Sequence, residues 1–114
     1  MTTNIERFQE ILNNPAIIPE LRGIVGFLEP TIQQLPERFY LFIWGLGSNC
    51  VFLRVHRDHE IIQINFWADR VEVCFPRREL SRELSFYYAD PHAFPKRFLK
   101  AVKAKIDYLD QPDG

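Results

Sequence analysis

The middle of the chain, from residue 38 to residue 75, is rich in β-branched and aromatic residues that come in short runs. Three polar breaks, GLGSN, HRDH and ADR, separate these runs. Short apolar runs divided by turn-forming residues are typical of an antiparallel meander, in which each strand pairs with the next one in the sequence. The pattern therefore predicts four strands, over residues 38–46, 50–56, 60–67 and 71–75.

The alternation of apolar and polar residues predicts the register of these strands and the face that each side chain occupies. Closing the second hairpin at its HRDH turn pairs Leu53 with Ile62. Closing the third hairpin at its ADR turn pairs Phe66 with Val73. Both hairpins then share one buried face, which is made of Val51, Leu53, Val55, Ile62, Ile64, Phe66, Val71, Val73 and Phe75.

Two helices are predicted before the sheet. The first begins after Thr3, a good N-cap with a glutamate three residues later, and ends before Pro15. The second follows helical spacing over residues 21–28, although two glycines weaken it, and Pro30 ends it. We expect residues 31–37 to be a connector, either irregular or with one helical turn, that Pro36 closes.

The segment after the fourth strand leaves alternatives open and then ends in a clear helix. Leu80 and Leu84 are spaced as on a short helix, whereas residues 83–88 fit a fifth strand or a packed loop. Apolar residues then recur at helical spacing over residues 94–110, and this stripe is expected to lie across the buried sheet face. The predicted fold for residues 1–114 is a single α+β domain with N-terminal helices, a four- to five-stranded antiparallel meander and a C-terminal helix packed on one sheet face.

Composition agrees with one small globular domain. The chain has 114 residues, of which 46% are hydrophobic and 14% aromatic, enough for a packed core. A net charge of −1 excludes a strongly basic nucleic-acid binder. No apolar run reaches the length of about 18 residues expected of a membrane span. The N-terminus lacks the pattern of a secretory signal, so we expect a cytoplasmic protein.

His56 and His59 are the residues that most suggest a metal site. In the predicted register they face each other across a hairpin mouth, with Cβ atoms about 5 Å apart. Cys50 lies about 20 Å away along the strand, so no third ligand converges, and we expect neither a metal nor another cofactor. The same register places Cys50, Asn65 and Cys74 in one row. The thiols of Cys50 and Cys74 are then about 9.5 Å apart, which is too far for a disulfide, so we expect free thiols.

Signatures of catalysis are weak. The WGLGSN segment leads from one strand to the next and not into a helix, so it does not match a phosphate-binding loop. One enzyme hypothesis stays open, in which His92 acts with a cysteine thiol or with a carboxylate. The sequence favours a non-enzymatic function, and it names no substrate or biological process.

The first strand, RFYLFIWGL, is apolar on both faces although the meander places it at a sheet edge. Edge strands usually carry charge or proline, or are short, and this one has no charge or proline inside it and is not short. The predicted N-terminal helices could cover its reverse face, or the SFYY segment could add a strand beside it. The alternative is a partner surface, because aromatic residues with an arginine are typical of interface centres.

We therefore expect a small binding or regulatory module that associates with a protein partner or with a second copy of itself. The contacts lie on the first strand and on the reverse face of the sheet. The predicted partner-binding residues are Tyr40, Phe42, Trp44, Phe52, Arg54, Ile61 and Trp67.

Nucleic acid or another polyanion is the alternative partner. All four lysines of the chain lie in the last predicted helix, where three of them form one stripe. The near-neutral chain and the acidic residues at its end favour an ordinary solvated helix face instead. The residues of this alternative are Arg77, Arg78, Lys96, Arg97, Lys100 and Lys103.

Overall fold

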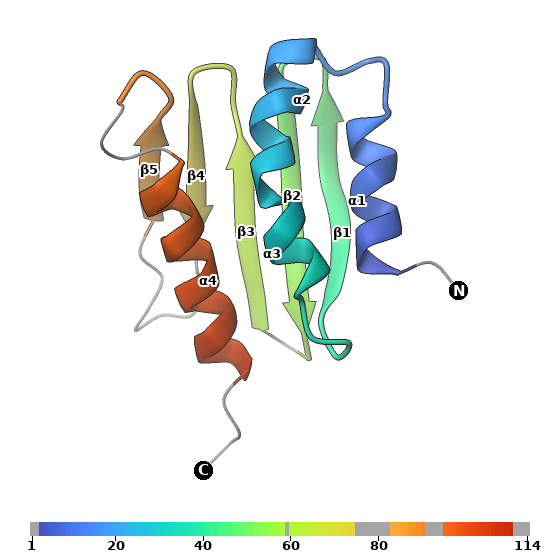
Figure 1. The fold of residues 1–114 in the computed structure, drawn as a ribbon, viewed down its shortest axis with the longest axis vertical. Helices are drawn as coiled ribbons and strands as arrows, with labels where there is room; N and C mark the ends of the chain where they lie inside the picture. Colours follow the sequence, from blue (N-terminus) through green and yellow to red (C-terminus); the bar gives the residue numbers. More distant parts are fainter. Residues whose placement is uncertain (1–2, 59, 75–82, 91–94, 111–114) are drawn as a thin grey trace.

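A computed structural model describes residues 3–58, 60–74, 83–90 and 95–110 of the chain. Its centre is a five-stranded antiparallel sheet in the order β1-β2-β3-β4-β5, so each strand pairs with its neighbour in the sequence (Figure 1). The predicted α+β fold with a meander sheet is confirmed. The strands are β1 (Tyr40–Gly47), β2 (Cys50–Arg57), β3 (Glu60–Phe66), β4 (Arg70–Cys74) and β5 (Glu83–Tyr87).

The strand β5 settles the alternatives for the segment after β4. It pairs with β4, and Leu84 lies opposite Val73 in the sheet, so the spacing of a short helix was misleading for Leu84. Leu80 lies outside the described residues. The idea that SFYY adds a strand beside β1 is wrong, because β5 forms the opposite edge of the sheet.

The helices are shorter before the sheet than after it. The Thr3 hydroxyl accepts a hydrogen bond from the Glu6 backbone N–H at 3.2 Å, which confirms the predicted N-cap. The expectation that Pro30 ends a helix is wrong. Pro30 lies in the first turn of a helix, where proline loses no hydrogen bond. The helical elements are α1 (Asn4–Leu12), α2 (Pro19–Val25), the 3-10 turn η1 (Gly26–Leu28), α3 (Glu29–Gln33) and α4 (Lys96–Asp110).

The helices α2, α3 and α4 lie in front of the sheet in Figure 1, and α1 lies beside the β1 edge. Their buried residues join those of the sheet in a single apolar cluster. The ring of Phe98 on α4 meets the rings of Phe66 and Phe86 edge to face, at centroid distances of 5.8 and 6.0 Å. The C-terminal helix thus packs as expected. The N-terminal helices share its face, so the expectation that they cover the reverse face is wrong. No helix in the described part of the chain is long and apolar enough to cross a membrane.

The predicted buried face of the sheet is correct, whereas the predicted register is not. Leu53 pairs with Ile64 and Phe66 pairs with Val71, so each hairpin is shifted by two residues. The second hairpin turns later than expected because Asp58 adopts a left-handed backbone conformation, with φ of 55°, which suits a tight hairpin turn. A shift of two keeps every side chain on its face. The fully buried members are Val51, Leu53, Val55, Ile62, Ile64, Phe66, Val71 and Val73, and Phe75 lies outside the described residues.

The strand β1 contains a β-bulge. Ile43 pairs with Leu53 and Gly45 pairs with Phe52, so Trp44 is an extra residue without a partner in the β2 register. A bulge bends the strand and increases its twist, which makes an edge a poorer template for another strand.

Asn4 of α1 takes the place of a neighbouring strand along part of the β1 edge. Its side-chain nitrogen donates to the carbonyl oxygen of Phe39 at 2.9 Å, and its side-chain oxygen accepts from the N–H of Leu41 at 3.0 Å. The carboxamide therefore satisfies outward-facing backbone groups that the next strand of a sheet would otherwise satisfy. An edge strand without internal charge or proline is thus protected by Asn4 and by the bulge.

We expect Asn4→Ala to lower the free energy of unfolding by about 1–3 kcal/mol, because the half-buried backbone groups of Phe39 and Leu41 lose their partner. Alanine favours helix more than asparagine does, so helix propensity would act in the opposite direction. Urea unfolding measures the effect. The exposed Gln9→Ala on the same helix is the control, with an expected change within about 0.5 kcal/mol. Equal effects of the two variants would contradict the role of Asn4.

Candidate functional site

The face of the sheet opposite the helices is the candidate site, and we call it the open face. No helix of the described chain lies over it. Its side chains alternate along the strands with the buried ones, and the register aligns Phe42 with Arg54 and Gln63 across three strands. The open face includes Tyr40, Phe42, Trp44, Cys50, Phe52, Arg54, His56, Gln63, Asn65, Trp67, Arg70, Glu72, Cys74, Ser85 and Tyr87.

Trp44 is the most exposed large apolar side chain of the described residues, with 67% of its surface accessible. The bulge places it where no residue of β2 lies directly opposite. The guanidinium carbon of Arg54 lies 5.5 Å from the centroid of its ring, so the cation supports one side of the indole. A bulky apolar ring is therefore held toward solvent by the strand geometry and by a neighbouring cation.

A glycine lets the aromatic surface continue from β1 to the end of β3. Gly45 lies opposite Phe52, and a Cβ atom at this position would come within 3.0 Å of the Phe52 ring. With glycine present, the Phe52 ring fits there and meets the Trp67 ring edge to face at a centroid distance of 4.7 Å. Trp44, Phe52 and Trp67 thus border a surface with Arg54 among them.

Arg54 is half-buried in this surface. Its Nη1 atom donates to the side-chain oxygen of Asn65 at 2.8 Å and to the carbonyl oxygen of Leu53 at 2.9 Å. Burial lowers the pKa of Arg54, partly opposed by the nearby Cys74, but a guanidinium stays charged at neutral pH. The side chain is therefore a fixed, partly desolvated cation.

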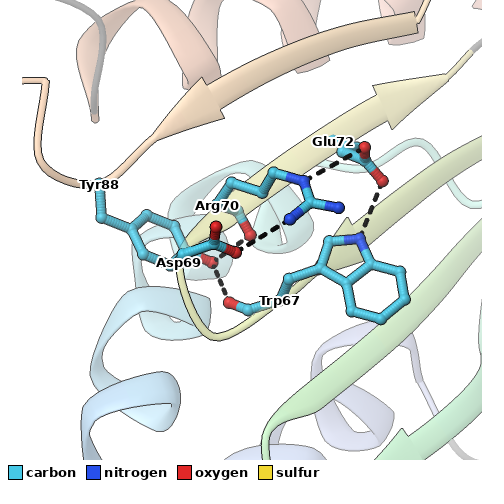
Figure 2. A network of polar contacts seen from close by, with 5 residues as sticks. All are labelled: Trp67, Asp69, Arg70, Glu72 and Tyr88. Carbon is cyan, nitrogen blue, oxygen red and sulfur yellow. Dashed lines mark hydrogen bonds and ion pairs between the residues drawn. The ribbon is translucent and has the colours of Figure 1, made fainter.

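A polar network lies at the end of the open face that is formed by the turn between β3 and β4 (Figure 2). The indole nitrogen of Trp67 donates to Glu72 at 2.8 Å. Arg70 donates from Nε to Glu72 at 3.4 Å and from Nη1 to Asp69 at 3.0 Å. Desolvation alone would lower the pKa of Arg70, but these two carboxylates outweigh it and raise the pKa. The charge of Arg70 is thus balanced within the protein.

Tyr88 fastens this turn to the end of β5. Its hydroxyl group lies 2.9 Å from the carbonyl oxygen of Trp67 and 2.8 Å from that of Arg70, and it donates its proton to this pair of oxygens. Its backbone N–H donates to the carbonyl oxygen of Asp69 at 3.3 Å. Burial raises the pKa of Tyr88, and the negative charge of Asp69 adds to the effect.

The structure brings most of the predicted partner-binding residues together on the open face. Tyr40 and Phe42 lie at the β1 edge with ring centroids 6.0 Å apart. Ile61 belongs to β3 and pairs with His56, but its side chain lies outside the described residues. That these residues bind a partner stays a prediction.

Sequence reasoning missed four residues that shape this surface. Glu72 and Arg70 balance its far end, Tyr88 fastens the turn beneath it, and the guanidinium of Arg7 lies 4.0 Å over the ring of Tyr40. The alternation of β4 would have placed Glu72 on this face. No signal in the sequence connects Arg7 or Tyr88 to residues so far away along the chain.

Four of the six residues of the polyanion alternative lie on α4, in the helical layer of the molecule. Lys96, Arg97, Lys100 and Lys103 are exposed on α4. Lys103 forms an ion pair with Asp107 at 3.3 Å, one turn further along the helix. The remaining two residues, Arg77 and Arg78, lie outside the described residues.

The histidines and cysteines are arranged differently from the sequence-based expectation. His56 pairs with Ile61 instead of facing His59, which lies outside the described residues together with His92. The predicted row of Cys50, Asn65 and Cys74 is wrong, because the shifted register pairs Asn65 with Phe52 and Glu72. Cys50 and Cys74 are not joined by a disulfide, as expected. Within the described ranges, no three histidine, cysteine or carboxylate side chains gather as a metal site.

Two hollows flank Arg7 at the beginning of β1. One, of about 540 Å³, lies among α1, α3 and β1, and the other, of about 380 Å³, follows the β1 edge. Among the described residues that line them, each hollow has a single carboxylate, Glu37 in the first and Glu10 in the second. Neither arrangement offers the paired acid and base of a hydrolytic site.

No model of a known protein family matches the chain, and no curated protein or solved structure matches it. The function is therefore argued from the open face itself.

We expect Tyr88→Phe to lower the free energy of unfolding by about 1 kcal/mol at neutral pH, since the shared hydrogen bond is lost. Above about pH 10 the unfolded tyrosine ionises, whereas the folded one, with its raised pKa, keeps its proton. The wild-type protein should then lose stability relative to the variant by up to about 1.4 kcal/mol per pH unit.

Urea unfolding at a series of pH values measures this difference. Tyr87→Phe, at the exposed neighbouring residue, is the matched control and should keep the wild-type profile. A Tyr88→Phe profile that runs parallel to the wild-type profile up to the highest pH would contradict the raised pKa.

Proposed function

We propose that the protein is a non-enzymatic binding or regulatory module that associates with a protein partner through the open face. The observation that supports this most strongly is the exposure of Trp44, at 67%, on a sheet face that no described helix covers. Tryptophan, tyrosine and arginine are the residues that contribute most to binding at protein interfaces. The open face presents all three types around one centre.

The face of the sheet, and not its edge, is the proposed contact surface. Asn4 occupies the outward-facing backbone groups of Phe39 and Leu41, and the bulge at Trp44 interrupts the regular strand beyond them. Both features oppose the addition of a further strand beside β1. Side chains, rather than backbone hydrogen bonds, therefore supply the contacts in this proposal.

The partner is another protein or a second copy of this chain, and the cytoplasm is the proposed compartment. The lack of a disulfide between Cys50 and Cys74 supports a reducing environment, because disulfides are favoured outside the cell.

Polyanion binding through α4 remains a second candidate, since its cations are exposed. It requires retention on nucleic acid that falls steeply between about 50 and about 200 mM salt. Binding that is insensitive to salt over this range would exclude it.

We expect Trp44→Lys and Phe42→Lys each to weaken association at least tenfold, about 1.4 kcal/mol, while the fold survives. Two measurements test this: sedimentation of the purified protein for self-association, and quantitative capture of protein partners from nuclease-treated lysate. Phe27→Lys is the control, because Phe27 is exposed to 43% on the helical layer. Circular dichroism and urea unfolding report whether each variant is folded.

If either open-face variant unfolds, the residue belongs to the core and the proposal loses its basis. If a folded Trp44→Lys variant associates as strongly as wild type, the open face is not the interface.

A further inference from the structure

The two arginines of the open face differ in how their charge is balanced. Arg70 has two carboxylates within reach, Asp69 at 3.0 Å and Glu72 at 3.4 Å. Arg54 has only neutral acceptors among the described residues, the Asn65 amide and the Leu53 carbonyl. A half-buried cation without a counter-charge is costly, and it is stabilised when an anion arrives.

The unused donors of Arg54 have the geometry that a carboxylate requires. Both of its hydrogen bonds leave from Nη1, whereas a guanidinium has five N–H groups in a planar fork. The edge formed by Nε and Nη2 is therefore free of bonds to described residues. Neither nitrogen is completely buried, because Nε of Arg22 is the one fully buried side-chain nitrogen or oxygen without a partner among the described residues. Such an edge binds a carboxylate through two parallel hydrogen bonds.

The groups around Arg54 fix its orientation and would shield an ion pair. Asn65 holds the guanidinium by one nitrogen, and the Trp44 ring lies beside it. Phe42 pairs with Arg54 in the sheet, and Phe52 lies on the same face of β2. When apolar groups exclude water from a charge pair, the local dielectric constant falls and the attraction strengthens.

We propose that Arg54 is the receptor for a carboxylate of the protein partner, an aspartate or glutamate side chain set among apolar residues that cover Trp44. This inference rests on the proposed function and narrows the partner to an acidic and apolar protein segment.

The charges of the open face favour this occupant over two others. A polyanion needs several cations along its path, whereas this face offers one unbalanced arginine and carries Glu72 beside Arg70. A second copy of the chain would have to present a carboxylate from its own open face. Of the two glutamates that the register places there, Glu72 is already engaged by Trp67 and Arg70, and the side chain of Glu83 lies outside the described residues.

The test is a selection from a displayed library of random peptides on the immobilised full chain. Wild type, Arg54→Glu, Trp44→Ala and Lys100→Glu are compared. Lys100→Glu is the matched control, because it changes the net charge by the same amount on the exposed face of α4. Wild type and Lys100→Glu should enrich peptides with aspartate or glutamate beside aromatic or aliphatic residues. Arg54→Glu should lose these peptides, and Trp44→Ala should enrich none.

A titration of one selected peptide then isolates the charge pair without depending on how a protein variant folds. Replacing its acidic residue by the matching amide should weaken binding to wild type by about thirtyfold. The same replacement should not weaken binding to Arg54→Glu, because the pair is already broken.

The outcomes separate this inference from the proposed function. Peptides that depend on Trp44 but contain no acidic residue, or that tolerate the amide, would overturn the role of Arg54 and leave the open face as an interface. Failure to enrich any peptide that depends on Trp44 would overturn both. Competition by single-stranded DNA that depends on Arg54 would identify a polyanion instead, and self-association abolished by Arg54→Glu would identify a second copy. Either result would overturn the inference.

Discussion

Both ends of the chain bury their apolar side chains against the same face of one sheet. Phe8 and Ile11 of α1 and Phe98 and Val102 of α4 belong to a single fully buried cluster with the inward-facing residues of the strands. A β-strand places successive side chains on opposite faces, so packing all of the helices on one face leaves the other to interact with solvent. The architecture is therefore two-layered, and every unusual feature of the open face follows from this arrangement.

Without a second layer, the open face is stabilised by contacts between its own side chains. Arginine stacks on tryptophan at both ends, with Arg54 beside Trp44 and Arg70 at 5.5 Å from the Trp67 ring centroid. Such contacts keep long side chains extended over apolar rings and reduce the apolar surface in contact with water. The two ends differ because Glu72 balances Arg70, whereas Arg54 has no such partner among the described residues.

The alternation of apolar and polar residues made the face of each side chain predictable. The register of the strands was not predictable, because it depends on the geometry of the turns. A register error of two residues leaves each side chain on its face, so the core was correct although the pairs were wrong. In the β2–β3 hairpin the error arose because the left-handed conformation of Asp58 has no distinct signature in HRDH. The side of the sheet that the N-terminal helices cover was equally hidden, since β1 is apolar on both faces. For the candidate site, alternation found Trp44, Phe52 and Arg54 but not Tyr88, whose role depends on a distant turn.

The close approach of Gly45 to the ring of Phe52 has a consequence for how this sequence can change during evolution. A Cβ atom at residue 45 would lie 3.0 Å from the ring, so any larger side chain there requires the ring to move or to be smaller. The two residues are neighbours across the β1–β2 hairpin. Substitutions at these positions should therefore be correlated: glycine should accompany an aromatic residue at 52, and alanine or a larger residue should be accepted where residue 52 is small.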